Sequence, residues 1–283
     1  MNALESRDAP ELTLPGLLVA PAWLRARLGR PGLRTIDLRE GDAYARGHVP
    51  GAVHLELEAL GTETDECENV LLPPDAFAEL MAARGISSGD VVVAYDDQWG
   101  LAAARLAWAL HRYGHTGVAV LDGGWDRWRE EGGPIAGGPE SADSQRVEPA
   151  PIEPGLFRVR PRSEVHADAE WIAASIARGD AVLLDTRTPA EFERGHLPGA
   201  LVWDWFHAVP QDSWNVSRDP DELRAEWRAL GFDVGDEVAV YCRSGMRAAH
   251  TWLVLRNAGF PRVRLYDGSW QEWSMRSGGS NGG

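Results

Sequence analysis

The sequence predicts an α/β protein with two domains, each a mainly parallel sheet flanked by helices. Two observations carry this prediction: short apolar runs alternate with helical patterns, and the 283-residue chain contains one series of motifs twice. Alternation of strands and helices is typical of a parallel sheet with covering helices. The copies are spaced by 148 residues between His48 and His196. A period this long indicates duplicated domains and not a solenoid of short repeats.

In the first copy, apolar spacing predicts helices over residues 19–28, 74–83 and 101–113. Short apolar runs predict buried strands over residues 34–38, 91–95 and 118–121. The second copy repeats the pattern, with strands near residues 181–184 and 237–241 and helices near 169–177, 220–230 and 247–257. The first 17 residues are polar and proline-rich, so we expect a loose arm.

The chain between the copies is rich in glycine, proline, glutamate and serine from Gly132 to Gly155, which indicates an interdomain linker. We therefore expect an N-terminal domain over 18–136, a linker over 137–156 and a C-terminal domain over 157–276. The tail over 277–283 is glycine and serine with one asparagine, and we expect it to be disordered.

Three motifs occur in both copies and in the same order. Asp185-Thr186-Arg187 matches the Asp-Leu-Arg run at 37–39, and Gly-His-x-Pro-Gly-Ala occurs at 47–52 and 195–200. Asp-Gly-x-Trp occurs at 122–125 and 267–270. A strand-end carboxylate such as Asp185 typically fixes the backbone or an arginine. Because His196 is also repeated, we expect it to stabilise a turn.

The copies differ at Cys242, which ends a short apolar run. Arg243, Ser244, Gly245, Met246 and Arg247 follow as a tight basic loop before a helix. A thiol under a helix N-terminus and between two arginines favours the thiolate, and the loop N–H groups can hold an anion. The sequence therefore indicates a nucleophilic cysteine that handles a negatively charged group.

The first copy has Asp96 where the second has its cysteine. The loop after it, Asp97-Gln98-Trp99-Gly100, carries no arginine. We therefore expect neither a nucleophile nor an anion cradle there. One copy is equipped for chemistry and the other is not.

Together these motifs resemble the rhodanese family of sulfurtransferases in its tandem two-domain form, from about Leu18 to Trp273. The resemblance implies two rhodanese-like domains and a persulfide on Cys242, which accepts a sulfane sulfur and passes it to cyanide or a thiol. It implies that the N-terminal copy is silent and frames the cleft. No cofactor is implied, because the cysteine carries the intermediate.

The resemblance also implies that Arg187 points into the substrate site, although Arg39 in the silent copy supports plain pairing instead. With Arg187, Arg243 and Arg247 are the candidates to hold the donor's oxyanion. The N–H groups of the loop, from Arg243 through Ser244, Gly245 and Met246 to Arg247, are expected to stabilise the persulfide. No histidine and cysteine cluster has metal-ligand spacing.

The sulfur donor is left open between two activities. In the family, thiosulfate-type loops read Cys-Arg-Lys-Gly and mercaptopyruvate-type loops read Cys-Gly-Ser-Gly. This chain has Arg243, which favours thiosulfate, and Ser244, which favours 3-mercaptopyruvate. The short run from Arg187 to Gly195 lacks the insertion common in the mercaptopyruvate type, which favours thiosulfate. A non-catalytic binding module is a further alternative, disfavoured by the retained cysteine.

Composition limits the partners. The formal net charge is −15, with 43 acidic and 28 basic residues, which argues against nucleic-acid binding. We expect a small-molecule donor and a thiol or protein acceptor. Cys67 lies among acidic residues that disfavour a thiolate, so we interpret it as a bystander. No apolar run could span a membrane and no signal peptide is evident, so a cytoplasmic protein is expected.

Overall fold

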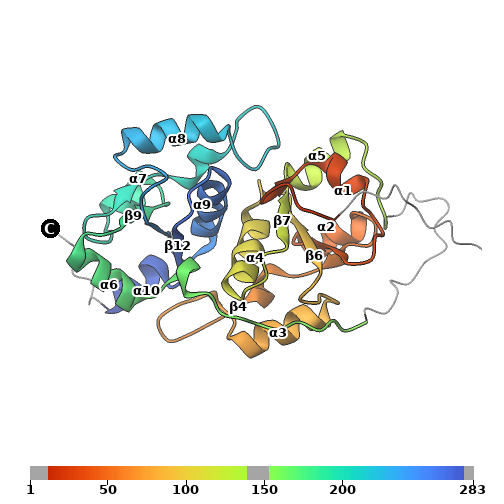
Figure 1. Ribbon diagram of the computed structural model, residues 1–283, viewed down its shortest axis with the longest axis horizontal. Helices are drawn as coiled ribbons and strands as arrows, with labels where there is room; N and C mark the ends of the chain where they lie inside the picture. Colours follow the sequence, from red (N-terminus) through yellow and green to blue (C-terminus); the bar gives the residue numbers. More distant parts are fainter. Residues whose placement is uncertain (1–11, 139–152, 277–283) are drawn as a thin grey trace, which may run out of the picture.

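The computed structural model describes residues 12–138 and 153–276, and the chain forms two α/β domains that lie side by side (Figure 1). Residues 1–11, 139–152 and 277–283 are outside the described residues. Much of the predicted arm and linker and the whole predicted tail therefore fall outside them.

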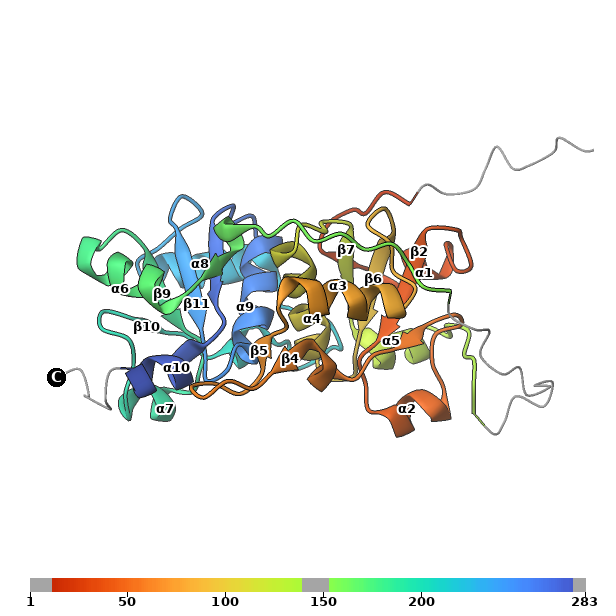
Figure 2. The ribbon, with the colours of Figure 1, turned by 90° about the horizontal axis from the view of Figure 1, so that it is seen from below.

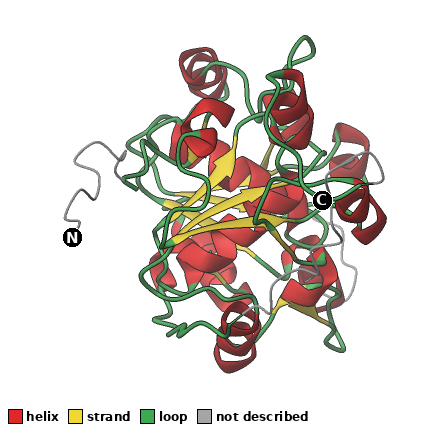
Figure 3. Cartoon of the chain, turned by 90° about the vertical axis from the view of Figure 1, so that its right-hand side faces the viewer, coloured by secondary structure: helices red, strands yellow, loops and turns green. Residues whose placement is uncertain are grey.

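The N-terminal domain is built on a five-stranded parallel sheet with the order β1-β7-β6-β2-β3. Its strands are β1 (Leu18–Val19), β2 (Leu33–Asp37), β3 (Val53–His54), β6 (Val91–Tyr95) and β7 (Val118–Leu121). All four pairings are parallel. Figure 3 shows the strands stacked with helices around them.

The C-terminal domain repeats this sheet with the same topology. Its order, β8-β12-β11-β9-β10, matches the first strand for strand. The strands are β8 (His166–Ala167), β9 (Val182–Asp185), β10 (Leu201–Val202), β11 (Val238–Tyr241) and β12 (Val263–Tyr266). The predicted duplication and the mainly parallel sheets are therefore confirmed.

Helices cover both faces of each sheet. In the N-terminal domain they are α1 (Pro21–Arg25), α2 (Gly41–Arg46), α3 (Pro74–Ala83), α4 (Leu101–Arg112) and α5 (Gly124–Glu130). In the C-terminal domain they are α6 (Ala169–Arg178), α7 (Pro189–Glu193), α8 (Pro220–Ala229), α9 (Met246–Asn257) and α10 (Ser269–Arg276). Short 3-10 turns η1 (Leu57–Leu60), η2 (Ser163–Val165) and η3 (Trp205–Ala208) complete the list.

The two domains meet through α4 and α9, which lie next to each other in Figures 1 and 2. One hydrophobic core runs from the first sheet through these helices into the second. Trp108 of α4 donates a hydrogen bond from Nε1 to the Val165 carbonyl at 3.0 Å. The rings of His111 and Trp252 meet edge to face, with centroids 5.2 Å apart. Shared burial of this kind holds the domains as one packed unit.

A hairpin of the N-terminal domain also reaches the C-terminal domain (Figure 2). It consists of β4 (Gly61–Thr62) and β5 (Val70–Leu71), which pair antiparallel. The Leu71 N–H donates to the Asp267 carboxylate at 2.8 Å. The segment between the strands, 63–69, therefore lies against the C-terminal domain.

One prediction for the start of the chain was wrong, and a second, most of which lies outside the described residues, is corrected at its last residue. The helix expected over 19–28 is shorter, because Val19 belongs to β1 and the helix begins only at Pro21. Proline at the first helical position has a fixed φ and needs no N–H acceptor. The expected loose arm is tied down at its end, because the Leu17 carbonyl accepts the Val120 N–H at 2.8 Å.

Some strands were not predicted from the alternation of apolar runs and helical patterns. These are the two-residue strands at the sheet edges and β12. No helix among the described residues combines the length and apolar character needed to cross a membrane.

Candidate active site

Cys242 lies immediately after β11 and four residues before the start of α9, and it is only 1% exposed to solvent. The segment that begins α10 holds its main chain from the other side. The Cys242 N–H donates to Ser269 Oγ at 3.2 Å, and the Trp270 N–H donates to the Cys242 carbonyl at 3.0 Å. Gly245 caps α9 with φ 84°, a left-handed conformation that glycine adopts without strain. The thiol is thus held on a fixed backbone.

Arg247 lies beside the thiol and is oriented by Glu191. Its Nη1 and Nη2 donate to the two Glu191 carboxylate oxygens at 2.7 and 2.8 Å. The hydrogen bond with Glu191 raises the pKa of Arg247, and the charge and hydrogen bond of Cys242 raise it further. The same contact with Arg247 lowers the pKa of Glu191 to about 2. The sequence analysis did not identify Glu191. A difference between the copies could have indicated it, because the first copy has Ala43 at the position that matches Glu191.

The other arginine of the loop, Arg243, is exposed to solvent and lies near Glu68. The Arg243 side chain is 65% exposed, and its Nη2 lies 3.8 Å from a carboxylate oxygen of Glu68. Met246 lines a cavity of about 80 Å³ together with Arg105 and Asn69. The loop therefore faces the N-terminal domain on this side.

Arg187 is buried and bound to structural partners. Its Nε and Nη2 donate to the Asp185 carboxylate at 2.9 and 2.6 Å, and Nη2 also donates to the Gly195 carbonyl at 2.7 Å. The guanidinium lies 5.0 Å from the centroid of the Trp270 ring. Arg39 of the N-terminal copy makes the matching contacts to Asp37, Gly47 and Trp125. A donor-binding role for Arg187 stays a prediction, and this geometry favours a structural one.

His196 has the same environment as its counterpart His48. The His196 ring stacks on Phe192 with centroids 3.7 Å apart, and its Nδ1 lies 2.9 Å from the Phe192 carbonyl oxygen. His48 stacks on Tyr44 at 3.9 Å and has Nδ1 3.0 Å from that carbonyl. The matching geometry accords with the turn-stabilising role expected for His196.

The N-terminal copy does contain an anion cradle, and the side chain of Asp96 fills it. The Asp96 carboxylate accepts N–H hydrogen bonds from Gln98, Gly100 and Ala103 at 2.8 to 2.9 Å. Burial raises the pKa of Asp96, against these three donors. The expectation of no cradle was therefore wrong, because backbone N–H groups converge there without any arginine.

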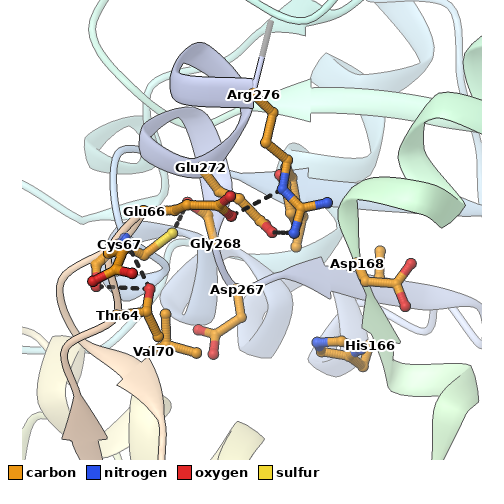
Figure 4. A pocket seen from close by; sticks show the side chains of 13 residues that line it. Thr64, Glu66, Cys67, Val70, His166, Asp168, Asp267, Gly268, Glu272 and Arg276 are labelled. Atoms are coloured by element: carbon orange, nitrogen blue, oxygen red, sulfur yellow. Dashed lines mark hydrogen bonds and ion pairs between the residues drawn. The ribbon is translucent and has the colours of Figure 1, made fainter.

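Cys67 lies on the hairpin segment, beside a cavity of about 410 Å³ between the domains (Figure 4). Its Sγ is 3.8 Å from the Gly268 carbonyl oxygen. Burial first, and then the charge of Glu272, raise the pKa of the Cys67 thiol to about 11. Such a thiol is protonated near neutral pH, which agrees with its interpretation as a bystander.

Comparison with known families gives two matches along the chain. A model of the rhodanese-like domain matches residues 20–131 and 168–276. A thiosulfate sulfurtransferase of Corynebacterium glutamicum is 35% identical over 93% of this chain and 89% of its own. The sulfur carrier protein TtuD of Thermus thermophilus is 31% identical over 92% of this chain and 94% of its own.

Among solved structures, the 3-mercaptopyruvate sulfurtransferase SseA of Escherichia coli superposes with a TM-score of 0.78. It is 28% identical, and the match covers 90% of this chain and 99% of that one. The chain therefore shares its two-domain fold with this enzyme.

Proposed function

This chain belongs to the rhodanese family of sulfurtransferases, and on that premise we propose that it moves a sulfane sulfur from thiosulfate to a thiophilic acceptor through Cys242. The observation that carries the proposal is the position of Cys242 between the end of β11 and the start of α9, with Arg247 in the first turn of that helix. A thiol beside a cation and a helix N-terminus is activated as a nucleophile.

The transfer proceeds in two balanced steps. The Cys242 thiolate attacks the outer sulfur of thiosulfate, the S–S bond of the donor breaks, and sulfite leaves with the bonding pair. The enzyme then carries a persulfide anion. Cyanide or a thiolate attacks the outer sulfur of that persulfide and restores the Cys242 thiolate. Neither step needs an external oxidant or a cofactor, because the cysteine itself carries the sulfur.

The backbone of the loop is the proposed cradle for the persulfide. In the silent copy, the N–H groups of Gly100 and Ala103 hold the Asp96 carboxylate. The matched residues in the catalytic copy are Gly245 and Ala248. Their N–H groups belong to the helix start, where N–H groups lack intrahelical acceptors. They are positioned to stabilise the terminal sulfur of the persulfide as the Asp96 oxygens are stabilised.

Among the arginines, Arg247 is proposed to hold the donor's sulfonate, with Arg243 guiding the anion from solvent. Arg187 is proposed to keep Asp185 and the strand ends in place, and any contact with the donor is secondary. Ser244 and Met246 complete the wall of the loop. These roles rest on the exposure of Arg243 and the pairing of Arg187 described above.

We also propose domain limits of 18–136 and 157–276, with the N-terminal domain lacking activity because Asp96 replaces the nucleophile and fills its own cradle. The acceptor is proposed to be a small thiol or the thiol of a sulfur-carrying protein. The relative named as a sulfur carrier protein supports the second of these.

The donor is tested by steady-state kinetics with thiosulfate and 3-mercaptopyruvate side by side. We expect the higher kcat/KM with thiosulfate, as the name of the Corynebacterium relative suggests. The alternative, favoured by the likeness to SseA, is the reverse preference. No transfer from either donor, with intact folding, would instead support a non-catalytic binding module.

A further inference from the structure

We propose that Arg105, on the silent domain, is a positioning residue for the Cys242 loop, because it neutralises the Asp267 carboxylate directly behind that loop. The inference deepens the function proposed above and rests on it for one of its measurements. It assigns the N-terminal domain an electrostatic role in the sulfur-transfer site of the other domain.

Arg105 lies on α4, is 2% exposed, and forms an ion pair across the domain interface. Its Nη1 is 2.6 Å from Asp267 Oδ1, and its Nη2 donates to the Asn69 carbonyl at 2.8 Å. The second Asp267 oxygen accepts the Leu71 N–H. Figure 4 shows the Asp267 side chain directed toward the hairpin residue Val70. The N-terminal domain thus supplies both the cation and the N–H donor that this carboxylate requires.

Asp267 begins the segment that holds the catalytic cysteine. Two residues later Ser269 binds the Cys242 N–H, and Trp270 binds the Cys242 carbonyl. The ion pair also touches the loop itself, since a Cβ on Gly245 would lie 2.8 Å from Arg105 Nη1 and 2.8 Å from Asp267 Oδ1. The ion pair therefore lies directly against Gly245, the residue that precedes α9.

The charge of Asp267 matters because the site must hold an anion. A buried carboxylate without a cation opposes a nearby thiolate or persulfide, and this repulsion is strong where water is excluded. A guanidinium at ion-pair distance cancels most of that field. We therefore expect Arg105 to act on the reactivity of Cys242 without contact with the donor.

The silent copy pairs the matched carboxylate from within its own domain. Asp122, which corresponds to Asp267, lies 2.6 Å from Nη1 of Arg127 on α5. Its other oxygen accepts the Val216 N–H at 2.9 Å, as Asp267 accepts that of Leu71. Both copies therefore have the carboxylate and an N–H donor from the opposite domain. They differ in whether the cation comes from the carboxylate's own domain or from the opposite one.

The arginine that pairs with the matched carboxylate comes from the carboxylate's own domain in one copy and from the opposite domain in the other. The position of Arg127 is occupied in the catalytic copy by Glu272, which cannot neutralise a carboxylate. The position of Arg105 is occupied in α9 by His250, whose Nε2 lies 3.0 Å from the Val216 carbonyl oxygen. Burial lowers the pKa of His250 to about 4, so it is neutral near pH 7. The N-terminal domain thus supplies the cation for Asp267, whereas the Asp122 cation, Arg127, comes from the domain of Asp122 itself.

The test compares Arg105→Met with the matched variant Arg127→Met, using the alkylation of Cys242 by iodoacetamide at pH 7, mapped by peptide mass spectrometry. We expect the alkylation rate to fall about tenfold in Arg105→Met and to stay within about twofold in Arg127→Met. The kcat/KM for thiosulfate should fall with it, about ten- to a hundredfold. A native alkylation rate in folded Arg105→Met overturns the proposal.

A double variant separates charge from packing. Arg105→Met/Asp267→Asn removes both charges, so its alkylation rate should return to within about threefold of native. If the ion pair served only as a mechanical tie, the double variant would stay as slow as the single one, and the proposal would be wrong. If Arg105→Met does not fold, the double variant is compared with Arg105→Lys, which keeps the positive charge. A double variant that is alkylated tenfold more slowly than Arg105→Lys would also show that the proposal is wrong. Alkylation needs no sulfur donor, so these outcomes remain informative if thiosulfate is not a substrate.

Discussion

Glu191 and Arg247 form a two-armed ion pair beside Cys242, with N–O distances of 2.7 and 2.8 Å. When His48 is aligned with His196 and Gly100 with Gly245, the N-terminal copy has Ala43 and Ala102 at the two matched positions. Contacts shared by both copies, such as Asp185 with Arg187, maintain the fold. This pair occurs only in the copy that has Cys242, which is consistent with the role proposed for Arg247.

The first prediction concerns the pH dependence of that pair. The pKa of Glu191 is lowered from its ordinary 4.5 to about 2 in the folded state, so its ionised form favours folding. The stabilisation is present above about pH 4.5 and is lost as the pH falls toward 2. Glu191→Gln should lower the free energy of unfolding by about 1–2 kcal/mol at pH 7, with the partial exposure of both side chains taken into account. The difference from native protein should shrink between pH 4.5 and 2.

Denaturant unfolding at several pH values measures this difference. The control is Glu193→Gln, two residues away and exposed, which should change stability by less than about 0.5 kcal/mol. If Glu191→Gln lowers the free energy of unfolding by the same amount at every pH, the ionised Glu191 carboxylate is not the source of the stabilisation.

The second prediction concerns the two cysteines. Cys242→Ser should abolish sulfur transfer, while Cys67→Ser should keep most of it, because burial and nearby carboxylates hold the Cys67 pKa near about 11. Intact-mass spectrometry after thiosulfate treatment should show one added sulfur, mapped to Cys242. A persulfide found on Cys67 alone would exclude the proposed mechanism.

The third prediction concerns donor preference. Arg243→Gly removes an exposed cation from the loop and should lower kcat/KM for thiosulfate about tenfold, the value of a charged hydrogen bond of about 1.5 kcal/mol. Turnover of 3-mercaptopyruvate should fall less. The control Glu68→Gln removes the neighbouring carboxylate and keeps the arginine, so thiosulfate turnover should not decrease. Equal loss with both donors would mean that Arg243 only shapes the loop.

The fourth prediction concerns the silent domain. Asp96→Cys/Cys242→Ser places a thiol in the backbone cradle of the N-terminal domain, but Ala43 and Ala102 supply no ion pair beside it. Thiosulfate-to-cyanide transfer should stay at least about a thousandfold below native, because the thiol lacks an activating cation. Activity within tenfold of native would show that the nucleophile and backbone N–H groups suffice.

Local patterns in the sequence were enough to predict the duplication, the parallel sheets and a candidate nucleophile. Central strands such as β6 and β7 were predicted with their observed bounds, because an apolar run buried on both faces is a local signal. The edge strands of two residues were missed, since so short a segment has no periodicity. Cys242 was identifiable because its loop is contiguous in the chain.

The charged side chains around that loop could not be predicted from local patterns, because tertiary contacts bring them there. Glu191 lies 56 residues from Arg247, and Arg105 lies in the other domain from Asp267. Residue type alone did not distinguish Arg187, bound to Asp185, from Arg247, beside the thiol. It also did not reveal that Asp96 fills its own backbone cradle. The Glu191–Arg247 and Arg105–Asp267 ion pairs depend on N–O distances of 2.6 to 2.8 Å between segments far apart in sequence. Packing of α4 against α9 brings Arg105 to the C-terminal domain.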